Sequence, residues 1–354
     1  PAVYQLGYPA GLGFYLRGVA YWQSKNKKRI FSQTTNGLLY SLDAATGNLD
    51  PVFGVNGMLD LRIGLSKPAQ RDTFGQSSPA LVCGKTLIVG SAINDFGVTF
   101  ENPRGDVRGF DPETGALKWT FHTIPQEGEF GIETWKNDSW KRTGNTNVWA
   151  PFSADLKAGL VYLPVATPNN DFFGGDRKGD GLFGESLVSL DCETGVRKWH
   201  FQLVHHGLWD YDPPTAPVLF DVKKNGQTFK GVVQVSKQGF AYVFDRITGT
   251  PAWPIVEKPV PQTDVPGEES SLTQPFPTKP AAFDRQGVDE NDLIDFTPEL
   301  RAEALRIVKQ YNYGPLFTPS SIKGTITVPG FWGGASWSGA AFNPLTGKLY
   351  VPSV

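Results

Sequence analysis

The stretch LDAATG at residues 42–47 returns three times, as FDPETG at 110–115, LDCETG at 190–195 and FDRITG at 244–249. Each copy joins an Asp, whose side chain can cap a turn, to a Gly that adopts positive φ at little cost. In three of the four copies a Trp stands four residues after the Gly, at Trp119, Trp199 and Trp253. The pattern predicts a recurring β-hairpin whose second strand carries a large aromatic side chain.

The repeated turns lie 68, 80 and 54 residues apart from Asp to Asp, so the repeating unit is larger than one hairpin. A second turn type alternates with them, as ADLKAG at 154–159 and FNPLTG at 342–347, each followed by a short apolar strand. Four-stranded units with a Gly and an aromatic residue at fixed places are typical of a β-propeller. We therefore predict an all-β propeller of four-stranded antiparallel blades, with the repeated Trp side chains docking one blade on the next.

Composition agrees with this fold class, since 40 Gly and 28 Pro among 354 residues exclude a helical bundle. Hydrophobic residues make up 40% of the chain, which is enough for a buried core. One helix is expected, from Pro298 to about Tyr311 and capped by Thr297. The net charge of −2 and the lack of a basic cluster argue against a nucleic-acid partner. No apolar run approaches the roughly 20 residues of a membrane span.

Cys83 and Cys192 are the only cysteines, and their spacing does not show whether they pair. Cys83 lies in the apolar run ALVC at 80–83, where we expect a small buried hydrophobic residue. The chain starts at Pro1, holds a single Met at Met58 and ends in the unfinished strand 349–354. We expect one propeller domain over 1–354 that is truncated at both ends, with the helix near 297–311 as an excursion.

Polar and aromatic residues are densest in VHHGLWDYD at 204–212. Its two His beside two Asp could form a metal site or an acid–base pair, or could be a polar loop that satisfies backbone groups. Asp210 stands between Trp209 and Tyr211, where burial would raise its basicity. Two oxygen-rich loops, GSAIND at 90–95 and ATPNND at 166–171, could supply ligands for a hard cation such as calcium, or could be ordinary turns.

Together these segments resemble the pyrroloquinoline-quinone-dependent dehydrogenases, most closely the membrane-bound glucose dehydrogenase type. The specific matches are LRGVAYW at 16–22, NVWAP at 147–151, the 204–212 segment and LFTPS at 316–320. The resemblance implies part of an eight-bladed propeller that binds pyrroloquinoline quinone and a divalent metal, Ca²⁺ or Mg²⁺, at its axis.

The resemblance also implies roles for individual residues. Trp149 would be the platform on which the quinone stacks, with Asn147 beside it, and Arg17 would pair with a quinone carboxylate. Lys237 would face the reactive carbonyl oxygens of the quinone and act with Asp210, the catalytic base. The metal ligands would come from Asn94, Asp95, Thr167 and Asp210. Asp212 would add negative charge near the metal.

The implied reaction is oxidation of a sugar or polyol hydroxyl by hydride transfer to the quinone, with electrons passed to a respiratory quinone. The place would be the periplasm, at the outer face of the inner membrane, with membrane attachment only through a segment missing here. The soluble quinoprotein alcohol dehydrogenases of this family carry two adjacent cysteines ahead of the position that Arg17 matches. This sequence has no such pair, which disfavours the alternative of a soluble quinoprotein alcohol dehydrogenase. A second alternative is a non-catalytic propeller scaffold, which would need the docking Trp residues and none of the site residues.

Overall fold

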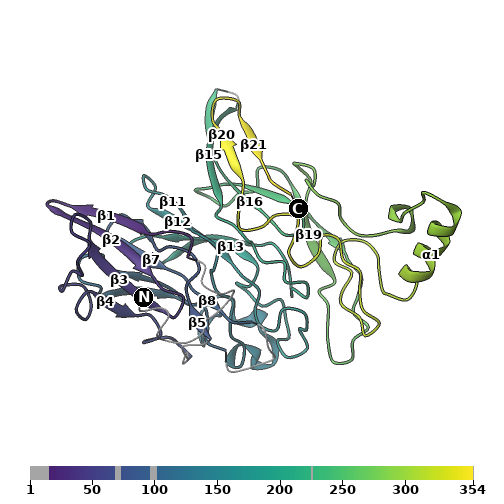
Figure 1. Cartoon of the computed structure of the whole chain (residues 1–354), viewed down its shortest axis with the longest axis horizontal. Coiled ribbons are helices and arrows are strands. Elements are labelled where there is room, and N and C mark those ends of the chain that lie inside the picture. The colour runs from purple at the N-terminus through teal and green to yellow at the C-terminus, as the bar shows by residue number, and fades with distance from the viewer. Residues whose placement is uncertain (1–15, 68–72, 96–101, 225, 354) are drawn as a thin grey trace.

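The computed structural model describes residues 16–67, 73–95, 102–224 and 226–353. Antiparallel strands dominate these residues, and they form three four-stranded sheets, one three-stranded sheet and three two-stranded pairs. Figure 1 shows the sheets following one another along the molecule, with α1 standing away from them at one end. The fold is therefore the predicted arrangement of propeller blades.

In each of the first three sheets, neighbouring strands of the sheet also lie near one another in the sequence. The first sheet is formed by β1 (Ala20–Ser24), β2 (Lys27–Gln33), β3 (Leu38–Asp43) and β4 (Met58–Asp60). The second has the order β10 (Leu117–Phe121), β9 (Val107–Phe110), β7 (Thr86–Val89) and β6 (Leu81–Cys83). The third is formed by β11 (Ser153–Asp155), β12 (Leu160–Val165), β13 (Ser186–Asp191) and β14 (Arg197–Gln202).

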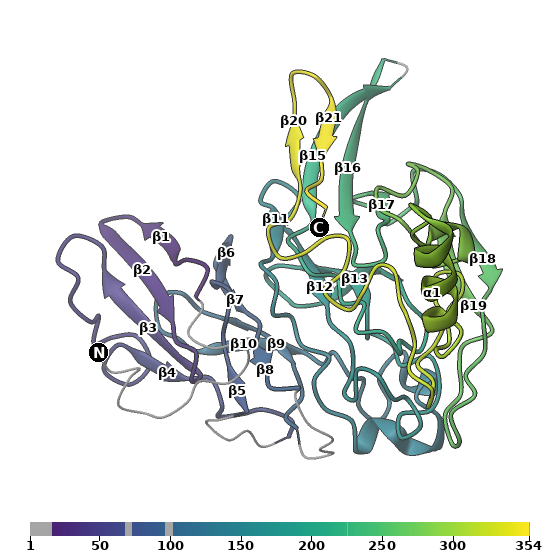
Figure 2. The ribbon, with the colours of Figure 1, turned by 45° about the vertical axis from the view of Figure 1, so that its right-hand side comes forward.

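The fourth sheet has three strands, and the remaining strands pair in twos. The fourth sheet contains β15 (Val218–Lys224), β16 (Gln227–Val235) and β17 (Ala241–Asp245). The pairs are β5 (Phe74–Gly75) with β8 (Ala92–Ile93), β18 (Ile255–Pro259) with β19 (Thr273–Pro277), and β20 (Ala341–Asn343) with β21 (Lys348–Tyr350). Short 3₁₀ helices are η2 (Ile132–Thr134), η3 (Lys136–Lys141) and η4 (Glu290–Asp292). Figure 2 shows the β20–β21 hairpin beside β15 of the fourth sheet.

The repeated Asp–Thr–Gly turns share one geometry, and the hairpin prediction is confirmed for the two that join β9 to β10 and β13 to β14. After the other two turns only isolated bridges follow, Leu42 to Leu49 and Phe244 to Pro251, so no paired second strand forms there. Each Asp Oδ1 accepts a hydrogen bond from the backbone N–H of the Thr three residues later, at distances between 2.8 and 3.1 Å. Each Gly has positive φ, between 70° and 78°. These Asp–Thr–Gly sets are 43, 46 and 47; 111, 114 and 115; 191, 194 and 195; and 245, 248 and 249.

Two of the three repeated Trp residues dock neighbouring sheets as predicted. The Trp119 indole donates to the Cys192 carbonyl oxygen at 3.0 Å, and its ring packs against Gly195 of the next repeat. Trp199 repeats this arrangement with the Arg246 carbonyl oxygen at 3.1 Å and with Gly249. Trp253 keeps 39% of its surface exposed, and its docking on a further repeat stays a prediction.

One further expectation, the end of the helix, needs correction, and the structure answers the open question of cysteine pairing. The helix α1 (Pro298–Val308) ends three residues before the predicted Tyr311, because the next residues turn with tighter i→i+3 bonds. Thr297 caps the helix as predicted, by accepting from the Leu300 N–H. Cys83 is buried among hydrophobic residues as predicted, and it forms a disulfide with Cys192 across 109 positions of sequence. A pairing between residues this far apart depends on the folded sheets, which spacing does not reveal.

Candidate functional site

The 204–212 segment runs between β14 and β15 and is anchored by its aromatic residues. Trp209 donates from its indole to the Thr318 carbonyl oxygen at 2.8 Å, and the Tyr211 hydroxyl donates to that of Pro329 at 2.7 Å. Both rings are buried in one hydrophobic cluster with Phe317. Asp210 stands between them with φ of 55°, a left-handed conformation that is uncommon for a residue other than Gly. The anchors thus hold the Asp210 backbone in a strained conformation of the kind found at active sites.

Asp210 faces Lys237, which follows β16. The Lys237 Nζ lies 3.1 Å from Asp210 Oδ1 and donates to the Asp210 carbonyl oxygen at 2.7 Å. Both side chains are largely buried, with 18% of Asp210 and 8% of Lys237 exposed. The structure therefore brings together the two residues expected to be catalytic, although 27 positions separate them.

Asp212 connects this pair to two other expected site residues. Its Oδ1 accepts from the backbone N–H of Thr167 at 2.7 Å and from the Thr167 hydroxyl at 2.8 Å. Its Oδ2 accepts from the Trp149 indole at 3.0 Å and lies 3.5 Å from the Lys237 Nζ. Sequence reasoning gave Asp212 only a supporting charge, whereas in the structure four of its contacts define the site.

The charges of the cluster are shifted by burial and by each other. Burial and the nearby Asp212 carboxylate raise the pKa of Asp210 well above its ordinary value, against the opposing effect of Lys237. Burial also acts on Asp212, but Lys237 and the hydrogen bonds from Thr167 and Trp149 outweigh it and lower its pKa. The pKa of Lys237 is raised because Asp212 and Asp210 outweigh its desolvation. The arrangement keeps Asp212 ionised and makes Asp210 the more basic carboxylate.

Arg17 and Trp149 lie together at one side of the cluster. The Arg17 guanidinium carbon is 5.4 Å from the ring centroid of Trp149 and 5.2 Å from that of Trp337. Its Nη1 donates to the Ser77 carbonyl oxygen at 3.1 Å. A guanidinium beside an indole suits the binding of a flat anion, because the guanidinium can pair with its negative charge and the indole can stack on its ring.

The other predicted ligands lie on neighbouring elements. Asn147 is buried and donates from its side chain to the Ser91 carbonyl oxygen at 2.8 Å, just ahead of β8. Asn94 and Asp95 follow β8 directly, and the Asn94 N–H donates to the Thr73 carbonyl oxygen. Burial and the Asp212 charge raise the pKa of Asp95 to about 6. Asp95 therefore interacts electrostatically with Asp212 and Lys237 of the same cluster.

Three further buried charges belong to this neighbourhood and were missed. Burial, with Asp95 and Asp212, raises the pKa of Asp171 well above its ordinary value. Burial raises the pKa of Glu185 to about 8. Arg177 donates to the carbonyl oxygens of Asn170 and Gly207. Asp171 closes the oxygen-rich 166–171 loop, which gave some signal, whereas Glu185 and Arg177 stand in unremarkable sequence.

The two histidines of the segment lie in different surroundings. His206 Nδ1 lies 2.6 Å from the Gly179 carbonyl oxygen, and burial lowers its pKa to about 4. His205 lies 3.0 Å from Gln202 and 3.2 Å from Glu257 through its two ring nitrogens. They contact different partners, and the Nε2 atom of His206 is buried without a hydrogen-bond partner.

The donor chemistry of the site fits a hard cation and a polar planar cofactor. Carboxylate, amide and hydroxyl oxygens are the groups that Ca²⁺ and Mg²⁺ prefer. Within the ranges that the structure describes, no three His, Cys, Asp or Glu side chains converge on one metal position, so a cation here would also use amide, hydroxyl or cofactor oxygens. Gln76 Oε1 and Ser91 Oγ are buried without a hydrogen-bond partner, and both line a small cavity beside Val148. An unpaired amide oxygen suits a cation or a hydrogen-bond donor, and an unpaired hydroxyl can also donate to a ligand oxygen.

Comparison with known proteins identifies relatives of the chain. Residues 8–354 match the family model described as PQQ: glucose/ethanol/alcohol dehydrogenase, beta-propeller domain. The chain is 34% identical over 326 residues to the quinate/shikimate dehydrogenase (quinone) of Acinetobacter baylyi, covering 92% of this chain and 40% of that protein. It is 33% identical over 349 residues to the quinoprotein glucose dehydrogenase of Escherichia coli, covering 93% of this chain and 42% of that protein.

Solved structures show the same fold. A quinohemoprotein alcohol dehydrogenase from Pseudomonas putida superposes on 96% of this chain and 43% of its own, with a TM-score of 0.65 and 24% identity. A europium-containing methanol dehydrogenase superposes on 96% of this chain and 52% of its own, with a TM-score of 0.66 and 23% identity. The chain thus spans about two-fifths of the length of the curated relatives described above.

Proposed function

The chain belongs to the propeller family of pyrroloquinoline-quinone-dependent glucose, ethanol and alcohol dehydrogenases, and we propose that it oxidises a hydroxyl group of a sugar or other polyol. The observation that carries the proposal is the buried network in which Asp212 contacts Trp149, Thr167 and Lys237. Lys237 in turn pairs with Asp210. Burying charges is costly, and buried ionisable groups that shift one another's pKa are concentrated at functional sites, so the cluster favours an active site over a propeller scaffold.

The residues can be assigned to cofactor and cation. Pyrroloquinoline quinone, when bound, supplies the acceptor for the two electrons of the substrate. Trp149 would stack against it, with Asn147 beside the ring, while Arg17 would hold a carboxylate and Lys237 a carbonyl oxygen. Asn94, Asp95, Thr167 and Asp210 would hold the cation, for which Ca²⁺ is our first candidate and Mg²⁺ the second.

Asp210 is the proposed general base. Its carboxylate Oδ1 lies beside the Lys237 ammonium, which favours the ionised form, so the ionised Asp210 can take the proton of the substrate hydroxyl. Lys237, fixed by two Asp210 contacts and one Asp212 contact, would hold positive charge where negative charge develops on the cofactor oxygen. Trp209 and Tyr211 keep Asp210 oriented and exclude water from its flanks.

Relatives guide the proposed substrate class, acceptor and location. Proteins named for quinate and shikimate, glucose and glycerol share between 31 and 34% identity with the chain, so a polyhydroxy substrate is proposed over a simple alcohol. A respiratory quinone is the proposed electron acceptor. The periplasm is the proposed location, which the Cys83–Cys192 disulfide supports because such bonds persist in oxidising compartments. Among the described helices, none has the length and apolar character needed to cross a membrane.

The proposal is tested by reconstituting the full chain with pyrroloquinoline quinone and CaCl₂. Quenching of Trp fluorescence measures binding, and reduction of an artificial dye measures turnover with aldoses, polyols, quinate and ethanol. We expect quinone binding that requires the cation, and dye reduction with a polyhydroxy substrate. Turnover with ethanol alone would favour the alcohol dehydrogenase alternative, and binding without turnover on any substrate would contradict the proposed activity.

A further inference from the structure

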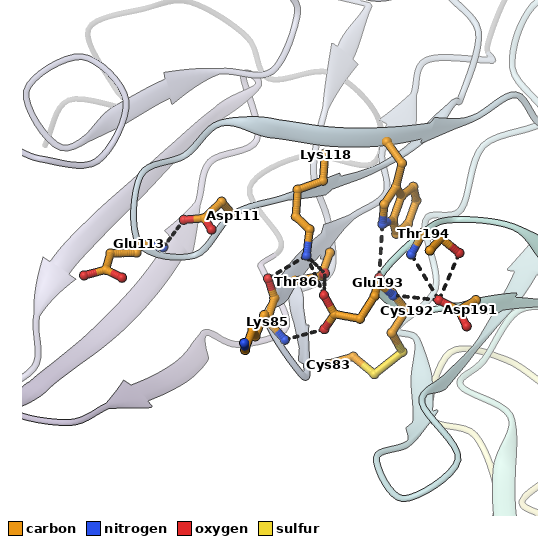
Figure 3. Close-up of polar contacts among 11 residues, drawn as sticks. Cys83, Lys85, Thr86, Asp111, Glu113, Lys118, Asp191, Cys192, Glu193 and Thr194 are labelled. Carbon is orange, nitrogen blue, oxygen red and sulfur yellow. Dashed lines mark hydrogen bonds and ion pairs between the residues drawn. A yellow bond between two sulfur atoms is a disulfide. The ribbon is translucent and has the colours of Figure 1, made fainter.

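The disulfide lies at one end of the interface between the second and third sheets, which we call the joint. Cys83 ends β6 and Cys192 follows β13, so the bond links the two sheets directly. Both residues are only 1% exposed and belong to the hydrophobic cluster that fills the joint. Figure 3 shows the bond beneath a group of polar side chains from both sheets.

Polar contacts surround the disulfide at the surface. Glu193 accepts from the Lys85 backbone N–H and from the Lys118 ammonium, each at 2.6 Å. The Glu193 side chain is 45% exposed and that of Lys118 is 25% exposed. Ion pairs exposed to water add little to stability. The covalent bond and the buried hydrogen bond from Trp119 to the Cys192 carbonyl oxygen are therefore the contacts that can hold this end of the joint, and the bond is the one that ties the two backbones covalently.

The opposite end of the joint lies against the candidate cofactor site. The Ser91 N–H donates to the Val148 carbonyl oxygen at 3.1 Å, and the Asn147 side chain donates to the Ser91 carbonyl oxygen. Strand β7 connects the two ends, since Thr86 lies beside Glu193 and Gly90 contacts Val148. The second sheet thus leads through β7 to Asn94 and Asp95. In the third sheet, Trp149 precedes β11 and Thr167 follows β12.

We propose that the Cys83–Cys192 disulfide is a positioning element, which fixes the two sheets so that their two sets of ligands meet one cofactor and its cation. This inference rests on the proposed function. A dithiol reductant would break the S–S bond, giving two cysteine thiols while the reductant becomes a cyclic disulfide. Loss of the bond would then weaken cofactor binding although neither sulfur touches the site.

The test compares the full wild-type chain with the double variant Cys83→Ala/Cys192→Ala and with Lys118→Met. Lys118→Met is the matched control, because it removes the polar contact at the same joint and keeps the disulfide. Affinity is measured by Trp fluorescence with pyrroloquinoline quinone and CaCl₂. We expect the dissociation constant to rise about tenfold or more in the double variant and to change less than about twofold in the control, as for other groups that orient ligands from outside the site.

Hydrogen exchange separates positioning from general stability. Under native conditions we expect faster exchange in the double variant at 86–95 and 145–150, with β15–β17 unchanged. Equal affinity, or equal protection of these segments, would overturn the inference. If the double variant does not fold, Cys83→Val/Cys192→Ala, which refills the buried space with apolar side chains, takes its place in both measurements. If the wild type binds no quinone, the proposed function fails, while the exchange comparison still decides whether the bond fixes the joint.

Discussion

Lys237 holds Asp210 at two points, with its Nζ 3.1 Å from the Asp210 carboxylate oxygen and 2.7 Å from the Asp210 carbonyl oxygen. The same ammonium lies 3.5 Å from Asp212. One buried cation thus fixes both the side chain and the strained backbone of the proposed base. Its removal would leave two buried carboxylates without their shared partner.

Lys237→Met should therefore lower the free energy of unfolding by about 3 kcal/mol, the typical cost of breaking a buried ion pair. Urea unfolding at pH 7.5 measures the change. Lys27→Met is the matched control, since the Lys27–Glu113 pair is 49% exposed on both sides. Such a surface pair should change stability by less than about 1 kcal/mol. Equal losses in the two variants would show that the buried cluster does not depend on its cation.

Asp210→Asn and Asp212→Asn should separate chemistry from binding. Asp210→Asn removes the proposed base and keeps an oxygen that can still face the cation, so turnover should fall by about 10²–10⁴-fold while quinone binding weakens far less. Asp212 accepts from Thr167 and Trp149, so Asp212→Asn should weaken quinone binding and lower stability. Dye-linked turnover and fluorescence titration of both variants provide the comparison. If Asp210→Asn retained turnover, Asp210 could not be the base.

A feature of this fold can be predicted from sequence when the residues that form it are close together in the chain. The Asp–Thr–Gly turns were predictable, because Asp43 caps Thr46 within four residues and the same bonds recur in every copy. The function of Asp212 was not, because it depends on Thr167, 45 residues earlier, and on Trp149, 63 residues earlier. The Cys83–Cys192 bond and the buried Glu185 likewise arise only when separate sheets pack together.

Gly195→Ala should destabilise the joint between sheets more than Gly47→Ala. Both Gly residues end the same turn with positive φ, 70° and 73°. A Cβ at Gly195 would lie 2.6 Å from the Trp119 ring, whereas a Cβ at Gly47 would meet nothing within 4 Å. We expect a loss of about 1 kcal/mol for Gly47→Ala from the backbone alone.

The added clash should bring the loss for Gly195→Ala to about 3 kcal/mol. Thermal and urea unfolding of both variants measure the difference. The docking role of Trp119 would be contradicted if the two variants were equally stable.

His200 should make stability depend on pH in the weakly acidic range. Burial among aromatic rings and the charge of Arg197 lower its pKa to about 4. A His with a lowered pKa stabilises the fold when neutral, so its contribution is present above the unfolded pKa of about 6.5 and is lost as the pH falls toward 4.

His200→Gln removes the titrating group and should flatten this part of the curve. The free energy of unfolding of the wild type should fall by about 1–2 kcal/mol more than that of the variant between pH 7 and pH 4, allowing for partial exposure. Urea titrations at half-unit intervals of pH measure the difference curve, from which the common effect of the carboxylates cancels. A difference that stays constant across this range would show that His200 is as easily protonated in the folded chain as in the unfolded one.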